Sequence, residues 1–376
     1  MESKRQNLLK EIREINHLIK NNKAESASLL SKIDDVNLKI RVRRNLIQIT
    51  NQQANLLTRE INSNKKNIEN LETELDLLKK NYADMVVRSY KSKSKQSKLM
   101  FLLSSENFLQ AYKRYNYMKQ YKSFQKKQAD SIVSKTEQLH ALNATLQIQK
   151  QNKEALIAEN RTAQVALQKE KNQQQLLVKD LKKDEAKYRK SIAKKQKESD
   201  RIEAQIEKMI RDAIAKANKK SGTKKSIKTF TLTAEAKALA KNFSNNKGKL
   251  PWPTKRGVLT KKPGKQRHSA VKGVYTTSKG IEITTSKDSD ARAVFNGEVF
   301  VIQKVKGANK AVYIRHGNYI TVYHNLKEIY VKKGDIVQTK DPVGKIATNS
   351  ENKTILKFYL FKDSANQNPT HWIYKM

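Results

Sequence analysis

The first 221 residues of this 376-residue chain contain neither glycine nor proline. These two residue types are the main interrupters of helices, so a stretch of this length without them is expected to be mostly continuous helix. All five prolines lie at or after Pro251, and nine of the eleven glycines lie at or after Gly257. The sequence therefore predicts two parts, a long helical arm and a small β-rich domain, and an α+β fold class.

A heptad repeat of apolar residues runs from Leu8 to Met85 in a single register. One seam position is mostly β-branched, and leucine is the commonest residue at the other, which favours a two-stranded coiled coil of roughly 115 Å. A looser heptad recurs from Ser131 to Ala215. We therefore expect residues 1–217 to form a long antiparallel coiled-coil hairpin. A parallel homodimer of the first helix is the alternative.

Nine aromatic residues gather between positions 82 and 124, at the expected tip of the hairpin. Ser105 is the expected N-cap of a short helix at this tip. Four apolar residues then share one helix face: Phe108, Leu109, Tyr112 and Tyr115. These side chains either close the end of the hairpin or mark a docking site, because a coiled-coil tip has little core to fill.

A basic, glycine-punctuated segment follows the arm. We predict a linker and a short regulatory helix over residues 218–249, with the helix at 232–243. Thr233 is its expected N-cap, and Glu235 lies in the first turn.

Residues 250–376 alternate between short apolar runs and turn signals such as Asn296-Gly297. This pattern predicts a compact antiparallel β domain. The expected strands lie at 281–286, 291–295, 298–304, 310–316, 319–324 and 355–361.

Composition restricts the kinds of site and partner that are expected. The chain has no cysteine, which excludes disulfides and thiolate zinc sites. Lys and Arg number 78 against 36 Asp and Glu, for a net charge of +42. This charge favours an anionic partner such as a cell-wall polymer, a phospholipid surface or nucleic acid, unless it only solvates the coil. We find no nucleic-acid module and few aromatic residues for stacking, so a nucleic-acid partner is not expected.

Several segments of the β domain together carry a family resemblance. They include L-P-W-P at 250–253, A-R-A-V-F-N-G-E-V at 291–299, I-R-H-G-N-Y-I-T-V-Y-H-N-L at 314–326 and N-P-T-H-W-I at 368–373. These segments resemble the LytM domain, the lysostaphin-like zinc endopeptidase fold that cuts peptidoglycan peptides. With the long coil and its Y-K-S-K-S-K-Q-S-K-L-M-F-L-L-S-S-E-N-F segment, nearly the whole chain resembles the EnvC-like murein hydrolase activators.

The resemblance implies that the metal and catalytic positions of the LytM family are substituted in this chain. The H-x-G-x-D strand reads S-K-G-I-E, so Ser278 and Glu282 stand at the two ligands. Asn325 stands at the histidine of Y-x-H-L, while Ile355 and Lys357 replace both histidines of H-x-H. One carboxylate cannot hold Zn²⁺, which takes three protein ligands in hydrolytic sites. We therefore expect no cofactor, no metal and no catalysis, with a Lys357–Glu282 salt bridge in place of the metal.

The other histidines are not expected to rebuild a metal site. His316 lies in a turn, and His324 should point to the face opposite its neighbour Asn325. An active zinc endopeptidase that cleaves peptidoglycan crosslinks is the alternative to a degenerate domain.

The same resemblance implies a function and partners. We expect a non-catalytic activator of a periplasmic N-acetylmuramyl-L-alanine amidase in cell division. Its coil would be recruited and switched by FtsEX, through the periplasmic loop of FtsX, and peptidoglycan or an anionic envelope surface is a further expected partner. The expected location is the periplasm. The start, M-E-S-K-R-Q, is not a signal peptide, so an export signal would have been removed.

The expected contacts fall into two groups. The tip contacts are Phe101, Leu102, Phe108, Leu109, Tyr112 and Tyr115. The contacts of the amidase-binding groove are Lys279, Glu282, Tyr323, Asn325, Lys357 and Tyr359. Residues 218–243 are expected to restrain the domain by covering this groove until the coil moves.

Overall fold

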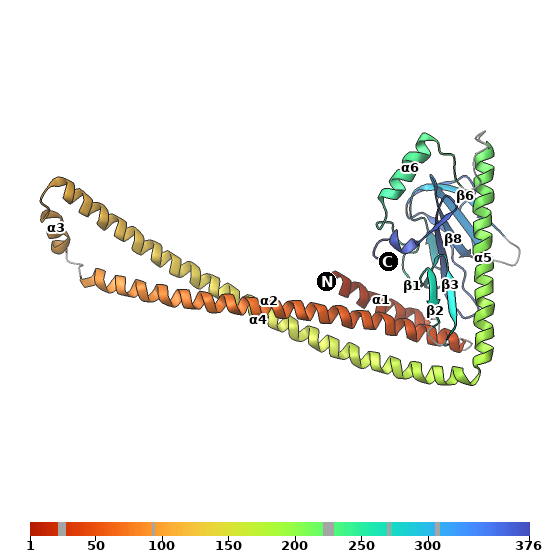
Figure 1. The fold of residues 1–376 in the computed structure, drawn as a ribbon, viewed down its shortest axis with the longest axis horizontal. Coiled ribbons are helices and arrows are strands. Elements are labelled where there is room, and N and C mark those ends of the chain that lie inside the picture. Colours follow the sequence, from red (N-terminus) through yellow and green to blue (C-terminus); the bar gives the residue numbers. More distant parts are fainter. Residues whose placement is uncertain (22–27, 92–94, 221–228, 269–270, 272, 305–308) are drawn as a thin grey trace. The chain divides into compact units, whose positions relative to one another are not determined.

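The computed structural model describes residues 1–21, 28–91, 95–220, 229–268, 271, 273–304 and 309–376. Long helices come first and an antiparallel sheet follows, so the predicted α+β class is confirmed (Figure 1). The chain divides into two compact units. The helical unit holds residues 1–2 and 47–164, and the sheet unit holds residues 3–46 and 165–376. Within the described residues, no helix is long and apolar enough to span a bilayer.

The helical unit is built from parts of two long helices, α2 (Leu29–Lys91) and α4 (Phe108–Lys183). Ile61 and Ile68 of α2 pack against Leu146 of α4. Polar contacts run in opposite directions along the two helices. The Asn64 amide donates to Gln149 at 2.9 Å, while Glu74, farther along α2, pairs with Lys135 at 2.5 Å. Within the helical unit α2 and α4 therefore run antiparallel, as in the predicted hairpin, over a shorter part of the chain than the predicted residues 1–217.

Two helix boundaries differ from the heptad prediction. The first seam does not run through one helix, because residues 2–21 form a separate helix, α1 (Glu2–Asn21). In the sheet unit Ile15 and Leu18 of α1 pack against Val42 of α2. The second seam is divided as well, because α4 ends at Lys183 and α5 (Glu185–Lys220) begins after a single turn residue.

The tip of the helical unit contains α3 (Lys95–Leu103) and the first turns of α4. The predicted N-cap is wrong. The side-chain oxygen of Asn107 accepts from the Gln110 backbone N–H at 2.9 Å, whereas the Ser105 hydroxyl donates to the Leu102 carbonyl. The helix is also not short, because it continues as the 76-residue α4.

The sheet unit contains a strand at each predicted position, although the strand predicted at 291–295 ends at Arg292. Its larger sheet has the order β1-β4-β11-β8-β7-β6-β9, with β12 beside β11, and the pairs β2–β3 and β5–β10 stand apart from it. The pairings between these strands are antiparallel. The bounds are β1 (Val258–Lys261), β2 (Gly264–Arg267), β3 (Tyr275–Ser278), β4 (Ile281–Thr285), β5 (Asp290–Arg292), β6 (Gly297–Gln303), β7 (Lys310–His316), β8 (Tyr319–Leu326), β9 (Ile336–Val337), β10 (Pro342–Lys345), β11 (Thr354–Lys362) and β12 (Ala365–Gln367), followed by the 3₁₀ turn η1 (Pro369–His371).

The two faces of the sheet are covered by different helices (Figure 1). Side chains alternate along β11, so Phe358 points to one face and Tyr359 to the other. The Phe358 face packs in one core with Phe243 of α6 (Ala234–Asn245). The Tyr359 face packs against Ile206 and Ile210 of α5.

The predicted linker and helix lie partly outside the described residues. Residues 218–220 continue α5, and residues 221–228 are not among those described. The short helix is present as α6, two residues later than predicted. Its N-cap is Thr233, whose side chain accepts from the Ala236 backbone N–H, and Glu235 lies in its first turn.

Candidate functional site

Three of the side chains of interest form one row across the α5-covered face of the sheet. Lys357 on β11 is paired directly with Glu282 on β4 and with His324 on β8. Directly paired residues of antiparallel strands point to the same face. The prediction that His324 points away is therefore wrong, because the strand register aligns it with Lys357.

The predicted salt bridge within this row is absent. Lys357 and Glu282 are cross-strand neighbours and both are half-buried, yet Lys357 makes no ion pair or hydrogen bond with any described residue. His324 beside it is 9% exposed, and its Nδ1 has no hydrogen-bond partner among the described residues. Burial, and after it the Lys357 ammonium, lower the pKa of His324 to about 4. The His324 imidazole is therefore neutral at neutral pH.

Asn325 ends the row in a left-handed backbone conformation, with φ of 77°. A non-glycine residue in this region is uncommon, and asparagine tolerates it better than most residues. The Asn325 amide donates to the Ile355 carbonyl at 2.6 Å and accepts from the Asn309 side chain. Its orientation is therefore fixed by β11 and by the residue that precedes β7.

A cavity of about 1140 Å³ lies over this row within the sheet unit. Four of the five substituted positions line it: Glu282, Asn325, Ile355 and Lys357. Its opposite walls come from α1, the start of α2 and the start of α5, through residues such as Leu18, Asp34 and Ser199. The row on the sheet therefore faces these three helices across the cavity.

The fifth position, Ser278, is held by α5 instead. The Glu203 carboxylate accepts from the Lys279 backbone N–H at 2.9 Å and from the Ser278 hydroxyl at 3.3 Å. Burial raises the pKa of Glu203 above its usual value. One turn later, Glu207 forms an ion pair with the Lys279 ammonium. Two carboxylates of α5 thus bond to the turn between β3 and β4 and hold it against the helix.

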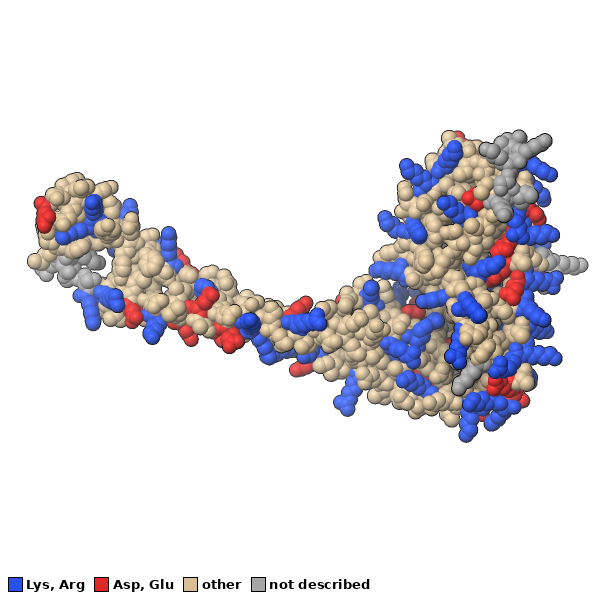
Figure 2. All heavy atoms as spheres, viewed as in Figure 1, with Lys and Arg blue, Asp and Glu red and all other residues tan. Residues whose placement is uncertain are grey.

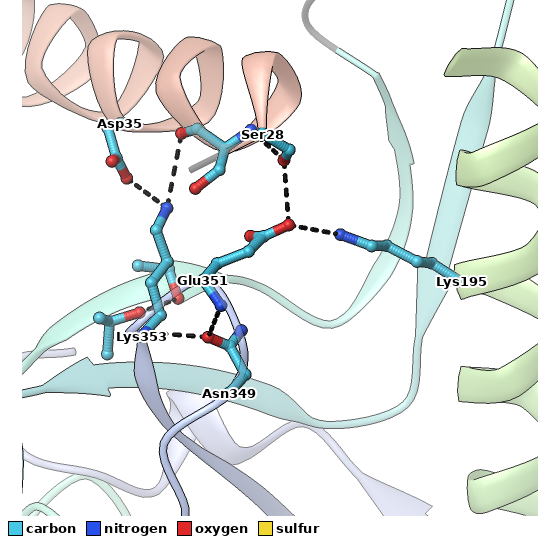
Figure 3. A network of polar contacts seen from close by, with 9 residues as sticks. Ser28, Asp35, Lys195, Asn349, Glu351 and Lys353 are labelled. Carbon is cyan, nitrogen blue, oxygen red and sulfur yellow. Dashed lines mark hydrogen bonds and ion pairs between the residues drawn. The ribbon is translucent and has the colours of Figure 1, made fainter. Parts of the chain in front are cut away.

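A polar network attaches α2 and α5 to the loop between β10 and β11 (Figure 3). Lys353 donates to Asp35 of α2 at 2.6 Å. Glu351 accepts from the Ser28 hydroxyl at 2.9 Å and from Lys195 of α5 at 3.2 Å. Figure 3 shows that these side chains converge from three segments far apart in the sequence. We call this network the clasp, because it bonds the loop to both α2 and α5.

Asp34, next to the clasp, lines the cavity and remains exposed to solvent there. Burial raises its pKa to about 6, although the nearby Lys353 opposes the shift. Sequence reasoning missed Asp34, Asp35, Glu203 and Lys353, because they belong to no motif and meet only through the fold.

The predicted groove residues divide into two sets. Glu282, Asn325 and Lys357 line the cavity, while Lys279 lies in the turn that α5 holds through Glu203 and Glu207. Tyr323 is fully buried in the core on the α6 side, where its hydroxyl accepts from the Val294 N–H. Tyr359 is 2% exposed beneath α5.

The predicted restraining arm, residues 218–243, is divided between the two faces of the sheet. Phe230 and Leu232 pack with Tyr359 in the α5-covered core, whereas Phe243 anchors α6 in the core on the other side. The cover over the Lys357 row comes from α5, the start of α2 and α1. The expectation that the helix of the arm lies over the groove is therefore wrong, because the opposite core uses the apolar face of α6, and residues 221–228 lie outside the described part of the chain.

The residues of the row do not fit a zinc ion. They offer one carboxylate and one buried imidazole, fewer than the three protein ligands of a hydrolytic zinc site, and the Lys357 ammonium between them would repel a divalent cation. His316 is committed elsewhere, since its ring nitrogens bond the Asn296 carbonyl at 2.6 Å and the Thr321 hydroxyl at 2.9 Å, and it stacks on Phe243. Within the described part of the chain, no group of three His, Asp or Glu side chains is placed to hold a metal.

The predicted tip contacts lie on the surface of the helical unit. Phe108 is 87% exposed and begins α4. Leu109, Tyr112 and Tyr115 are also exposed, and Leu102 is half-buried. Phe101 lies under the Arg114 guanidinium, 4.8 Å from the ring centre.

Positive charge covers much of the sheet-unit face in Figure 2, where lysine and arginine side chains far outnumber acidic ones. This distribution is consistent with the net charge of +42.

Residues 276–369 match the model of Peptidase family M23. Among solved structures, the chain is similar to one in the SpoIIQ–SpoIIIAH pore-forming complex (25% identity, 34% of this chain and 91% of that chain, TM-score 0.29). It is also similar to a mutant catalytic domain of the prophage-encoded M23 protein EnpA from Enterococcus faecalis (23% identity, 32% of this chain and 94% of that chain, TM-score 0.28). A third similar structure is LytU (25% identity, 31% of this chain and 83% of that chain, TM-score 0.26). No curated protein matches the chain. The LytM-type, or M23, domain is thus confirmed over residues 276–369, and the likeness to EnvC-like activators stays a prediction.

Proposed function

We propose that this chain is a non-catalytic regulator at the bacterial cell wall, whose M23 domain binds another protein instead of cleaving peptidoglycan. The M23 domain indicates a cell-wall-related function. The observation that carries the proposal is the row on its α5-covered face, where Lys357 replaces a ligand that an M23 peptidase needs for its metal. The partner we propose is a periplasmic N-acetylmuramyl-L-alanine amidase, which the domain activates during cell division.

The proposed mechanism is a shift between a closed and an open state. In the closed state α5 and the start of α2 cover the Lys357 row and roof its cavity. In the open state these helices move away, and the amidase binds the exposed face. A cover that is a few kcal/mol more stable docked than free keeps the open state rare, yet a partner can still displace it.

The tip of the helical unit is the proposed receiver of the signal. Its exposed apolar residues lie far along α2 and α4 from the residues of the same two helices that belong to the sheet unit. We propose that the periplasmic loop of FtsX docks on this tip and that FtsEX recruits and switches the chain. Because α2 and α4 are continuous helices, movement at the tip is transmitted to the part of α2 that holds the cover.

The test is an amidase assay on purified peptidoglycan with dye release as the readout. The chain alone should release no product, with or without added zinc, and should increase release by an amidase purified from the same bacterium. A Phe108→Glu/Tyr112→Glu variant should activate the amidase equally in solution but should not bind the purified FtsX loop. Release by the chain alone in the presence of zinc would support the zinc endopeptidase instead, and no effect on the amidase would refute the activator.

A further inference from the structure

Lys357 has the properties of a binding residue that lacks its counterpart. It is half-buried, lines the cavity and pairs with no described residue. An ammonium removed from bulk water without a partner is unfavourable, so positions of this kind are normally paired. The neighbouring His324 also has an unpartnered Nδ1 and is almost fully buried. Of these two adjacent side chains only Lys357 lines the cavity, so the unused hydrogen-bonding capacity toward this space belongs to its ammonium.

The covering helices show which chemistry this face accepts. Asp35 of α2 pairs with Lys353, and Glu207 of α5 pairs with Lys279. Glu203 of α5 accepts from the Lys279 backbone N–H. In these three contacts a helix supplies the carboxylate and the M23 domain supplies the donor. The opposite polarity occurs at Lys195 of α5, which pairs with Glu351, at Arg41 of α2, which donates to the Leu259 carbonyl, and at the Gln196 side-chain amide of α5, which donates to Thr277. The covering carboxylates nevertheless bond two lysine residues of the domain, Lys279 and Lys353.

We propose that the exposed face binds a helix of the amidase through carboxylates, and that one of these carboxylates pairs with Lys357. This inference rests on the proposed function and names the chemistry of its partner contact. The incoming helix takes over Lys279 and Lys353 from Glu207 and Asp35. The pair with Lys357 is new, because no described residue of the cover makes it.

This difference gives the partner an advantage over the cover. Both helices satisfy the same lysines at the rim, so these contacts contribute similarly to the closed and the bound state. A carboxylate at Lys357 adds a charge-assisted hydrogen bond that only the bound state contains. A hydrogen bond to a charged group is worth about 1.5–3 kcal/mol, or roughly a tenfold to hundredfold difference in affinity.

The test measures binding of the purified amidase to the full chain and to two Lys357 variants. Lys357→Met keeps the length and removes the charge, and it should weaken binding about tenfold or more. Lys357→Glu places like charges together and should weaken binding further. Lys362→Met is the matched control, because Lys362 lies on the same strand and is exposed outside the cavity. Thermal unfolding of each variant shows whether it is folded, and Lys357→Met remains informative if Lys357→Glu is not.

A charge exchange identifies the partner residue. Acidic residues of the amidase are replaced one at a time by lysine. One replacement should restore binding to Lys357→Glu and should weaken binding to Lys362→Met, which keeps Lys357. Wild-type affinity in both Lys357 variants would overturn the carboxylate contact and leave the activator proposal standing. Absence of binding by the wild-type chain would overturn both.

Discussion

Replacing Lys353 by alanine should loosen the start of α2 from the sheet unit. The Lys353 ammonium lies 2.6 Å from an Asp35 carboxylate oxygen and 3.4 Å from the Ser31 carbonyl. The two side chains are only 15% and 27% exposed, so solvent screens this pair less than a surface pair. Removal also leaves Asp34 and Asp35 next to each other without their nearest cation.

The expected loss follows from these contacts. A charge-assisted bond of this kind is worth about 1.5–3 kcal/mol, and the uncompensated carboxylate adds to the cost of its removal. We expect the substitution to lower the free energy of opening at the start of α2 by about 2 kcal/mol, which corresponds to roughly a thirtyfold increase in its open population. Leu30 and Ile33 still pack against Leu181 of α4, so α2 should be loosened and not released.

Hydrogen exchange followed by mass spectrometry measures this opening directly. Backbone amides of residues 29–40 should exchange roughly thirtyfold faster in Lys353→Ala, while those of α6 should not change. Lys345→Ala is the matched control. The Lys345 ammonium lies 3.6 Å from the Asp288 carboxylate, a longer distance than in the Lys353 pair, and the Asp288 side chain is 63% exposed. It should change exchange by less than about threefold. Equal exchange of residues 29–40 in the two variants would show that the clasp does not hold the cover.

Two further predictions concern pH and the core. The folded-state pKa of Asp34 is raised to about 6 from 3.8, so the stability that its protonated form provides is present below about pH 4 and is lost as pH rises toward 6. Asp34→Asn should flatten this dependence in urea unfolding, by about 1 kcal/mol after allowance for its solvent contact in the cavity, and an unchanged pH profile would contradict the assignment. Phe243→Ala should lower the free energy of unfolding of the sheet unit by about 3–5 kcal/mol, because this fully buried ring contacts His316, Tyr319 and Trp372. Chemical denaturation followed by tryptophan fluorescence checks it, and a loss below about 1 kcal/mol would contradict the packing role.

Local patterns in the sequence predicted the elements well, because each depends on neighbouring residues. The lack of glycine and proline before Gly222 predicted long helices, and period-two alternation predicted β4 to β8 and β11. Thr233 was predicted as a cap because its side-chain oxygen and the following N–H groups are close in sequence.

What a helix packs against was harder to predict. Ile202 and Ile206 continue the second heptad seam and were interpreted as coiled-coil positions, yet they pack on the sheet under Tyr359. An apolar stripe on a helix has the same spacing whether its partner is a helix or a sheet. The turn at Asp184 that redirects α5 onto the sheet contains neither glycine nor proline, so nothing in the local pattern marked it.

The sequence predicted which residues belong to the site, but it did not predict how their side chains are arranged. The motif comparison found Glu282, Asn325 and Lys357, and all three line the cavity. The position of His324 was mispredicted because strand alternation was counted from Asn325, whose left-handed conformation interrupts it. The predicted Lys357–Glu282 salt bridge failed because a shared register fixes the backbones of two residues and leaves their charged ends free to turn.

The unpaired cation at position 357 is best understood through the requirements of a switch. An apolar residue there would pack under the cover without the cost of a desolvated charge, and replacing buried charged groups by well-packed apolar ones is often stabilising. The closed state is therefore less stable than this fold allows. A cover of maximal stability could be displaced only by a partner whose affinity for the open state exceeds its affinity for the closed state by a correspondingly larger factor. A half-buried lysine that the cover leaves unpaired lowers that barrier, and it lowers it selectively for a partner that brings a carboxylate.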